Sequence, residues 1–298
     1  MSLRTFLGAI LLSATHYVTP VFSQEMTRDI ITDKGKITLE LGASYLTGSK
    51  TAGITHNTLM FHMNTKVYRI GGRYGLSEDS EVYAQAIVQD ATNILMDRRT
   101  GLVLNRSSPT YAPIFSAIML GGNHRIKGDN NFGIIGFSDI FIPMDHRLER
   151  FKYWREDNST SLSTGFRIYG TSDKVTLSSD LGYKAKFAYT TGYATGDNHI
   201  SYDNSDVLFF EPRIAFEFNE KTTIMGGVPI HMVGHATRGG VSYRPQVTHS
   251  FFEFGVTREL DNRTNLSFQA VIAEAQQPFQ SSIDMHLTLT KQLDGFFN

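Results

Sequence analysis

The sequence contains no cysteine, so the fold must be held together without disulfides. Beyond the N-terminal region it also lacks any run of about 18 consecutive apolar residues, which excludes a transmembrane helix there. The net charge is only −1, which gives no electrostatic reason to expect a nucleic-acid partner. A single tryptophan accompanies 21 phenylalanines, 13 tyrosines and 26 glycines, and this composition is consistent with a chain rich in β-strands.

The first residues have the pattern of a secretory signal peptide. Arg4 supplies a positive charge, residues 6–14 an apolar core, and residues 21–23 a cleavage site with small side chains. A membrane anchor is the weaker alternative, because this core is too short to span about 30 Å of hydrocarbon. We expect residues 1–23 to be removed, residues 24–34 to form a short periplasmic segment, and residues 35–298 to form the membrane domain.

The stretch from residue 66 to residue 90 has the pattern of an antiparallel hairpin. Apolar and polar residues alternate with period two on both sides of a polar turn at residues 76–80. One of the two alternating sets carries Arg69 and Arg73, where a soluble sandwich would bury valine or leucine. Strands of roughly 9–11 residues with one apolar and one polar face are typical of a transmembrane barrel, with lipid outside and water inside.

Connections along the chain alternate between short turns and longer loops. The short turns fall at residues 77–80, 127–131, 170–173, 219–221 and 260–263, and the long connections at 47–57, 91–109, 144–160, 190–205, 233–243 and 274–280. Bacterial outer-membrane barrels have short periplasmic turns, longer extracellular loops and an even number of strands, whereas a soluble sandwich has no reason to keep its long loops on one side.

Twelve strand-like stretches lie between these connections. They cover residues 35–46, 59–74, 81–90, 110–125, 132–143, 161–169, 175–189, 207–218, 222–232, 247–257, 264–273 and 282–291. The sequence therefore predicts an all-β fold, an antiparallel transmembrane β-barrel of about 12 strands in the bacterial outer membrane.

Five short stretches resemble the phenol-degradation meta-pathway family of outer-membrane proteins. They are residues 27–35, 73–82, 136–139, 171–175 and 260–266, the last together with the final strand. The resemblance covers nearly the whole chain after the signal peptide, and it lies in turn sequences rather than in chemistry. It implies a barrel related to channels for hydrophobic compounds and to the barrel that secretes functional amyloid. Only a few residues separate the cleavage site from the first strand, which leaves no room for the periplasmic coiled coil of the amyloid exporter.

The polar set of side chains is expected to face the barrel interior, if the apolar set faces lipid. Two interpretations remain open: a water-filled pore whose charge rings select solutes, or a plug of salt bridges paired across the lumen. Barrels of eight strands are filled by side chains and barrels of 16–18 strands leave an aqueous channel, so twelve strands lie between these cases. The predicted pore-lining residues carry both signs of charge and are Glu40, Arg69, Arg73, Arg167, Asp180, Lys184, Lys186, Glu211, Arg213, Glu217, Glu253, Asp284 and His286.

Two prolines mark a candidate irregularity of the barrel wall. Pro212 and Pro229 fall inside neighbouring predicted strands, the second close to Gly226 and Gly227. Proline cannot donate to a β-ladder and is confined to edges or bulges. The pair therefore indicates either a local gap that lets an apolar solute leave sideways into the membrane, or two bulges near the rim.

Other surface features point to the membrane as the main partner of the chain. The loop at residues 145–157 mixes charged and aromatic side chains; it either constricts the pore, meets lipopolysaccharide phosphates through its arginines, or is a solvated loop. Tyrosines near strand ends are expected to form interfacial girdles against outer-membrane lipid: Tyr45, Tyr74, Tyr83, Tyr111, Tyr169 and Tyr189.

No residue pattern indicates an enzyme. His249 and Ser250 are adjacent in a strand, so they point to opposite faces and cannot act as base and nucleophile. The other histidines lack metal-ligand spacing, and there is no glycine motif for phosphate, so we expect no metal and no cofactor. The sequence predicts a channel for passive passage of small-molecule solutes, and the resemblance narrows these to hydrophobic or aromatic compounds. The alternative is a structural or secretion-accessory barrel that transports nothing by itself.

Overall fold

We describe the fold from a computed structural model. It describes residues 31–54, 57–97, 103–107, 114–129, 131–144, 159–193, 196–203, 205–244, 246–273 and 279–294. The expected signal peptide, the loop at 145–157 and Tyr111 lie outside these residues. None of the described residues forms a helix long and apolar enough to cross a membrane.

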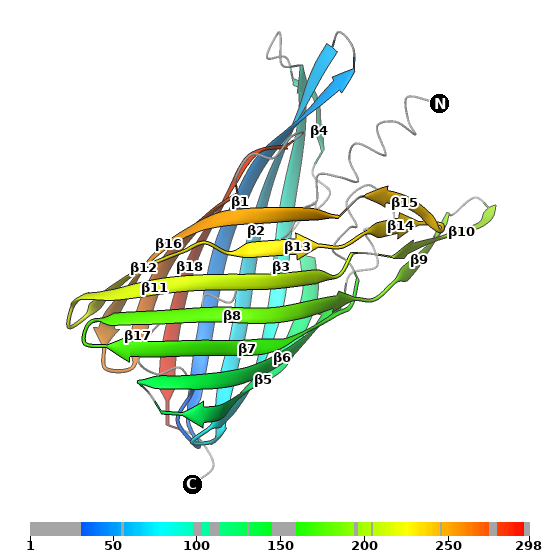
Figure 1. The fold of residues 1–298 in the computed structure, drawn as a ribbon. Helices are drawn as coiled ribbons and strands as arrows, with labels where there is room; N and C mark the ends of the chain where they lie inside the picture. The colour runs from blue at the N-terminus through cyan, green and yellow to red at the C-terminus, as the bar shows by residue number, and fades with distance from the viewer. Residues whose placement is uncertain are drawn as a thin grey trace.

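The structure is a closed antiparallel β-barrel of 12 strands (Figure 1). Its wall elements follow one another in the order of the chain, and β1 pairs with β18 to close the sheet. β12 and β13 together occupy one position of the wall, because both pair with β11 on one side and with β16 on the other. The wall elements are β1 (Ile37–Ile54), β2 (Asn57–Ser77), β3 (Ser80–Asp97), β5 (Ile114–Gly128), β6 (Phe132–Pro143), β7 (Ser161–Ser172), β8 (Val175–Lys186), β11 (Val207–Asn219), β12 (Thr222–Gly227), β13 (Ile230–Val233), β16 (Val247–Asp261), β17 (Thr264–Ala273) and β18 (Phe279–Leu293).

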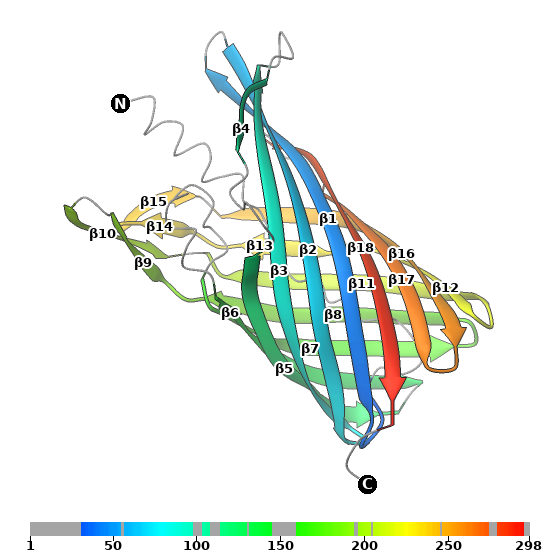
Figure 2. The same cartoon turned by 180° about the vertical axis from the view of Figure 1, so that it is seen from behind.

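Each predicted strand corresponds to one wall position, but several predicted loops contain strands, and two of them extend the wall. The connection predicted at residues 47–57 is mostly strand, because β1 and β2 pair continuously as far as Ile54 and Asn57. Likewise, β3 extends to Asp97 and pairs there with β4 (Val103–Ser107). Glycine, serine and threonine at residues 47–57 indicated a loop, whereas the pairing of β1 with β2 keeps the chain extended there. Figures 1 and 2 show β1 to β3 rising past the rest of the wall.

A second, small sheet forms from connections that were predicted as loops. It consists of β9 (Tyr189–Tyr193), β10 (Gly196–Asp203), β14 (Ala236–Arg238) and β15 (Val241–Arg244), in the order β15-β14-β10-β9. These strands are short, so their alternation is too brief to be recognised in the sequence. They lie beside one mouth of the barrel (Figure 2). We call this end of the barrel the loop end and the opposite end, with the short turns, the turn end.

The outer face of the wall is apolar. Ile70 is 61% exposed, Leu41 51% and Phe254 51%, although each lies in the middle of a paired strand. Their neighbours along the strand point inward and are polar and buried, such as Glu40 and Arg69. An outward apolar surface over a polar interior is the arrangement of an outer-membrane barrel.

Candidate functional site in the barrel lumen

All of the predicted pore-lining residues lie on inward-facing positions of the wall. Register partners connect them around the barrel: Gly42 on β1 lies opposite Arg69 on β2, and Asp180 on β8 lies between Arg167 on β7 and Glu211 on β11. Burial agrees with this placement, since Glu40, Arg69, Asp180, Glu253 and His286 are all buried. The remaining eight members are partly buried and belong to the same inward set: Arg73, Arg167, Lys184, Lys186, Glu211, Arg213, Glu217 and Asp284.

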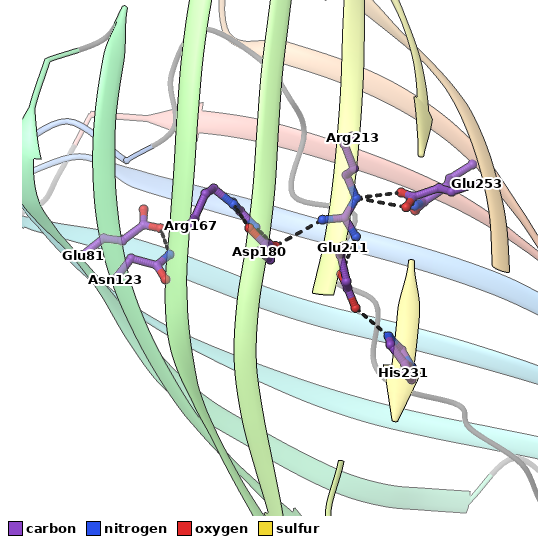
Figure 3. A network of polar contacts seen from close by, with 9 residues as sticks. Glu81, Asn123, Arg167, Asp180, Glu211, Arg213, His231 and Glu253 are labelled. Carbon is purple, nitrogen blue, oxygen red and sulfur yellow. Dashed lines mark hydrogen bonds and ion pairs between the residues drawn. The ribbon is translucent and has the colours of Figure 1, made fainter. Parts of the chain in front are cut away.

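Five of these residues form an ion network centred on Arg213 (Figure 3). The Arg213 guanidinium contacts three carboxylates: Nη1 is 3.1 Å from Asp180, Nη2 is 2.6 Å from Glu211, and Nε is 2.9 Å from Glu253. Arg167 donates from Nε and Nη2 to the two oxygens of Asp180, at 2.6 and 2.5 Å. Such two-bonded arginine–carboxylate pairs are the strongest ion pairs in proteins. We call Arg167, Asp180, Glu211, Arg213 and Glu253 the ion network.

His231 contacts the ion network through Glu211. Its Nε2 lies 2.8 Å from Oε1 of Glu211, and because an ionised carboxylate only accepts, Nε2 carries the proton. The network contains two guanidinium and three carboxylate groups, so a neutral His231 leaves it with one excess negative charge. Gln269 donates a hydrogen bond to Glu253, which satisfies a further lone pair of that buried acid.

A second polar group lies on β1, β2 and β18. Arg73 Nη2 lies 3.3 Å from Glu40. Arg69 Nη1 donates to Ser44 Oγ at 3.2 Å and faces His286 Nδ1 at 3.3 Å. The guanidinium can only donate, so Nδ1 accepts and the His286 proton sits on Nε2. That nitrogen is 3.1 Å from Asp284 Oδ2 but is not aligned as a hydrogen bond.

The N-terminal segment closes in on the lumen at the turn end. Ile31 packs against Ile135 and Tyr169 inside the barrel, and Thr32 N donates to Glu81 Oε2 at 2.8 Å. Glu81 is 1% exposed, and Asn123 Nδ2 binds its other oxygen at 2.6 Å. Sequence reasoning missed this site, because Glu81 adjoins a turn and its partners are far away in the sequence.

Close backbone contact explains a glycine of this segment. Gly75 accepts the N–H of Gly35 at 2.8 Å and donates to Lys36 at 3.1 Å. A Cβ on Gly75 would lie 2.0 Å from the carbonyl oxygen of Asp33, so any other residue would push the N-terminal segment away.

Aromatic rings line the lumen nearer the loop end. Phe137 and Phe209 stack with centroids 6.1 Å apart, Phe209 meets His231 at 6.2 Å, and His231 meets Phe251 at 5.0 Å. We call Phe137, Phe209, His231 and Phe251 the ring row. Sequence reasoning missed the row because its list of inward residues contained only charged side chains and His286, and no phenylalanine.

Two glycines make room for the ring row. Gly165 and Gly182 are register partners on β7 and β8. A Cβ on Gly165 would lie 2.7 Å from Cζ of Phe137, and one on Gly182 would lie 2.4 Å from Cζ of Phe209. The tips of the two rings therefore occupy the space that a side chain at either glycine would need. Glycines at inward positions of the sequence are the signal that could have indicated this.

The tyrosine girdle prediction is wrong for two residues. Tyr169 lies inside the barrel, 1% exposed, and its hydroxyl donates to the Asp129 carbonyl oxygen. Tyr83 is also inward, because it pairs with Arg73 on β2 and its ring covers Gly121 on β5. Both occupy the polar set of their strands, so the period-two pattern places them in the lumen rather than against lipid.

The wall at the two prolines is in register but lacks two hydrogen bonds. Pro212 lies on β11, and Pro229 lies between β12 and β13; two residues separate the flanking pairs on each strand, so no bulge occurs. Val228 N donates to Pro212 O at 3.1 Å, and Phe251 N donates to Pro229 O at 2.9 Å. Neither proline can return a hydrogen bond, so the carbonyls of Val228 and Phe251 lack the ladder donor that another residue would supply.

Within the described residues, no group of three histidine, aspartate or glutamate side chains is arranged to hold a metal ion. His249 faces the lumen opposite His231, and Ser250 on the next position faces outward opposite Ile230. This geometry offers no base beside a nucleophile.

A scan against protein-family models found no match, and a search of curated proteins found no relative. Among solved structures, the fold is similar to the COG4313 outer membrane channel from Pseudomonas putida F1, with a TM-score of 0.65, 9% identity, and coverage of 88% of this chain and 97% of that one. It is also similar to the translocator domain of autotransporter NalP from Neisseria meningitidis, with a TM-score of 0.54, 12% identity, and coverage of 87% and 89%.

The NanC porin gives a TM-score of 0.52 at 10% identity, with coverage of 86% of this chain and 100% of the porin. At sequence identities this low, the similarities concern the fold alone. Together with the apolar outer face, they assign the chain to the β-barrels of the bacterial outer membrane.

Proposed function

We propose that the protein is a passive outer-membrane channel for small apolar or aromatic compounds. The observation that carries the proposal is the ring row, in which Phe137, Phe209 and Phe251 each stay partly exposed inside the barrel. Apolar surface at inward positions has no role in a purely ionic plug, whereas it favours a planar apolar solute over water.

The ring row suits transient binding. Aromatic pairs are worth about 0.5–1.5 kcal/mol beyond area burial, and a channel needs several weak sites rather than one tight site, so that solutes can leave. Phe137, Phe209 and Phe251 come from three separate wall strands; Phe137 stacks on Phe209, and His231 lies between Phe209 and Phe251. A solute could therefore exchange one ring partner for the next along the row.

Matched variants on one strand test this function. Phe209 faces the lumen, and Phe210 beside it is 42% exposed on the lipid face. In a porin-deficient bacterial host that expresses the chain, we expect F209A to reduce uptake of radiolabelled toluene at least threefold and F210A to leave it unchanged. Equal uptake by wild type, F209A and the host without the chain would refute the proposal.

Lateral exit into the membrane is the second part of the proposal. It is supported by the ladder bonds missing at Pro229 and at Pro212, which lies between Glu211 and Arg213 of the ion network. The native chain has no cysteine, so a disulfide between F210C and I230C, which are register partners, can clamp these strands. We expect toluene uptake to fall when the disulfide is oxidised and to recover on reduction; equal uptake in both states would exclude lateral exit.

A closed structural or secretion-accessory barrel is the alternative function. It is favoured by the paired charges of the ion network and by Ile31 and Thr32, which are buried in the lumen at the turn end. Ion conductance of the purified chain in planar bilayers separates the two functions. We expect single-channel steps; silence over repeated insertions would favour the closed barrel.

A further inference from the structure

Arg69 differs from the other luminal arginines in its pairing. Arg73, Arg167 and Arg213 each have a carboxylate oxygen within 3.3 Å. Arg69 has no ion pair among the described residues, although it is only 7% exposed. An isolated guanidinium in such a place is costly unless something pairs with it.

The unused atoms of Arg69 are those that bind carboxylates side-on. Its Nη1 contacts Ser44 and His286, whereas Nε and Nη2 are buried and have no hydrogen-bond partner in the part of the chain that the structure describes. In Arg167 the same two atoms hold both oxygens of Asp180. Arg167 therefore shows how a carboxylate binds the Nε and Nη2 face of a guanidinium, whereas the same face of Arg69 has no partner among the described residues.

Neither neighbouring acid forms an ion pair with Arg69 in the described part of the chain. Asp284 and Glu40 act on Arg69 electrostatically, but Glu40 pairs with Arg73. Asp284 Oδ2 lies 3.1 Å from Nε2 of His286, and Asp284 Oδ1 is buried without a hydrogen-bond partner among the described residues. The imidazole contacts Arg69 with one nitrogen and Asp284 with the other, so it lies between the two charges. A further anion therefore meets Arg69 at Nε and Nη2 rather than at the side that His286 covers.

An apolar cluster borders the same arginine. Ile87 is the register partner of Arg69 on β3, and Val67 is the next inward residue of β2 toward the loop end. Val67, Ile87 and Ala117 form a buried cluster, and Phe141 packs against it. A ligand held at Arg69 would thus place its charged group on Nε and Nη2 and its body against hydrocarbon.

We propose that Arg69 is the binding site for the carboxylate of a small apolar monocarboxylate, such as an aromatic acid. The inference rests on the proposed channel function and adds a solute class to it. The proposed site requires the planar two-donor face of arginine, because a lysine ammonium offers charge without this geometry.

Benzoate and benzyl alcohol test the site, since they share a ring and differ in charge. Binding of each to the purified full chain in detergent is measured by calorimetry. We expect wild type to bind benzoate at least tenfold more tightly than benzyl alcohol, R69M to bind both alike, and R69K to lose most of the preference. K66M is the matched control, because Lys66 lies on the outer face of the same strand, and we expect it to behave as wild type.

Three results would overturn the inference: no benzoate preference in wild type, an unchanged preference in R69M, or a full preference in R69K. Heat-modifiable gel migration identifies variants that fail to fold. If R69M fails to fold, the benzoate preference of R69K decides the test. If D284N creates a preference that wild type lacks, Asp284 occupies the Arg69 face and the inference is wrong. Toluene uptake is measured separately. If benzoate preference fails while toluene uptake is intact, the channel function stands and only the carboxylate site is refuted. If benzoate preference is present while the chain adds nothing to toluene uptake, only the channel function is refuted.

Discussion

The loop-end part and the central part of the lumen are built from successive inward positions of the same strands, yet they are stabilised in different ways. On β11, Phe209 belongs to the ring row, and Glu211 and Arg213 on the next inward positions belong to the ion network. The ring row packs against glycines and leaves apolar surface partly exposed. The ion network pairs its charges across four wall strands and leaves little exposed. The proposed function places selectivity for apolar solutes in the ring row, and we expect the ion network to make the wall rigid.

Removing the central guanidinium is the largest expected disruption of this comparison. R213M leaves Asp180, Glu211 and Glu253 as buried carboxylates without their shared cation, which costs about 3–5 kcal/mol. Urea unfolding followed by heat-modifiable gel migration measures the loss. R213K keeps the charge and is expected to lose less. A loss below about 1 kcal/mol in R213M would show that the network is dispensable for rigidity.

Much of this arrangement follows from the sequence, because period-two alternation fixes which side chains face inward once the strands are recognised. Glu40, Arg69, Asp180 and Glu253 were identified in this way. Pairings such as Arg213 with Glu253 could not be derived, because they depend on the register of β11, β12 and β16 together.

The apolar part of the lumen was missed for a different reason. Inward residues such as Val67, Ile87 and Phe209 interrupt the alternation of polar side chains, so they read as irregularities rather than as a second lining. Glu81 and Thr32 are 49 positions apart, and no local pattern indicates that they meet.

Loss of one acceptor at the turn end is the next largest effect. Thr32 N and Asn123 Nδ2 donate to different oxygens of Glu81. E81Q turns one of these oxygens into an amide N–H₂ that faces a donor, which costs about 2 kcal/mol for an unsatisfied buried group. Hydrogen exchange at the Thr32 amide is expected to accelerate. E78Q, an exposed glutamate of the same turn, is the control; protection of Thr32 in both variants would mean that Ile31 packing alone holds the segment.

A smaller effect is expected where the ring row meets its glycine. G182A places a Cβ 2.4 Å from Cζ of Phe209 and 2.8 Å from the Thr164 carbonyl oxygen, and overpacking of this kind costs about 1 kcal/mol when the ring can move. G72A is the matched control, since its nearest neighbour is 3.5 Å away. We expect toluene uptake to change in G182A alone; an unchanged uptake would separate the ring position from transport.

The smallest expected effect concerns acid stability of the turns. Backbone N–H groups of Asn131 and Phe132 donate to the Asp129 carboxylate at 2.7 and 3.1 Å and hold the pKa of Asp129 below its ordinary value. A carboxyl with a lowered pKa stabilises the fold at neutral pH, and this contribution is lost as the pH falls through its folded-state pKa. D129N should therefore lose less stability than wild type between pH 7 and pH 3, as measured by urea unfolding. Tyr169 also donates to the Asp129 backbone, so if D129N shows the full wild-type loss, this tyrosine rather than the carboxylate fixes the turn beneath the N-terminal segment.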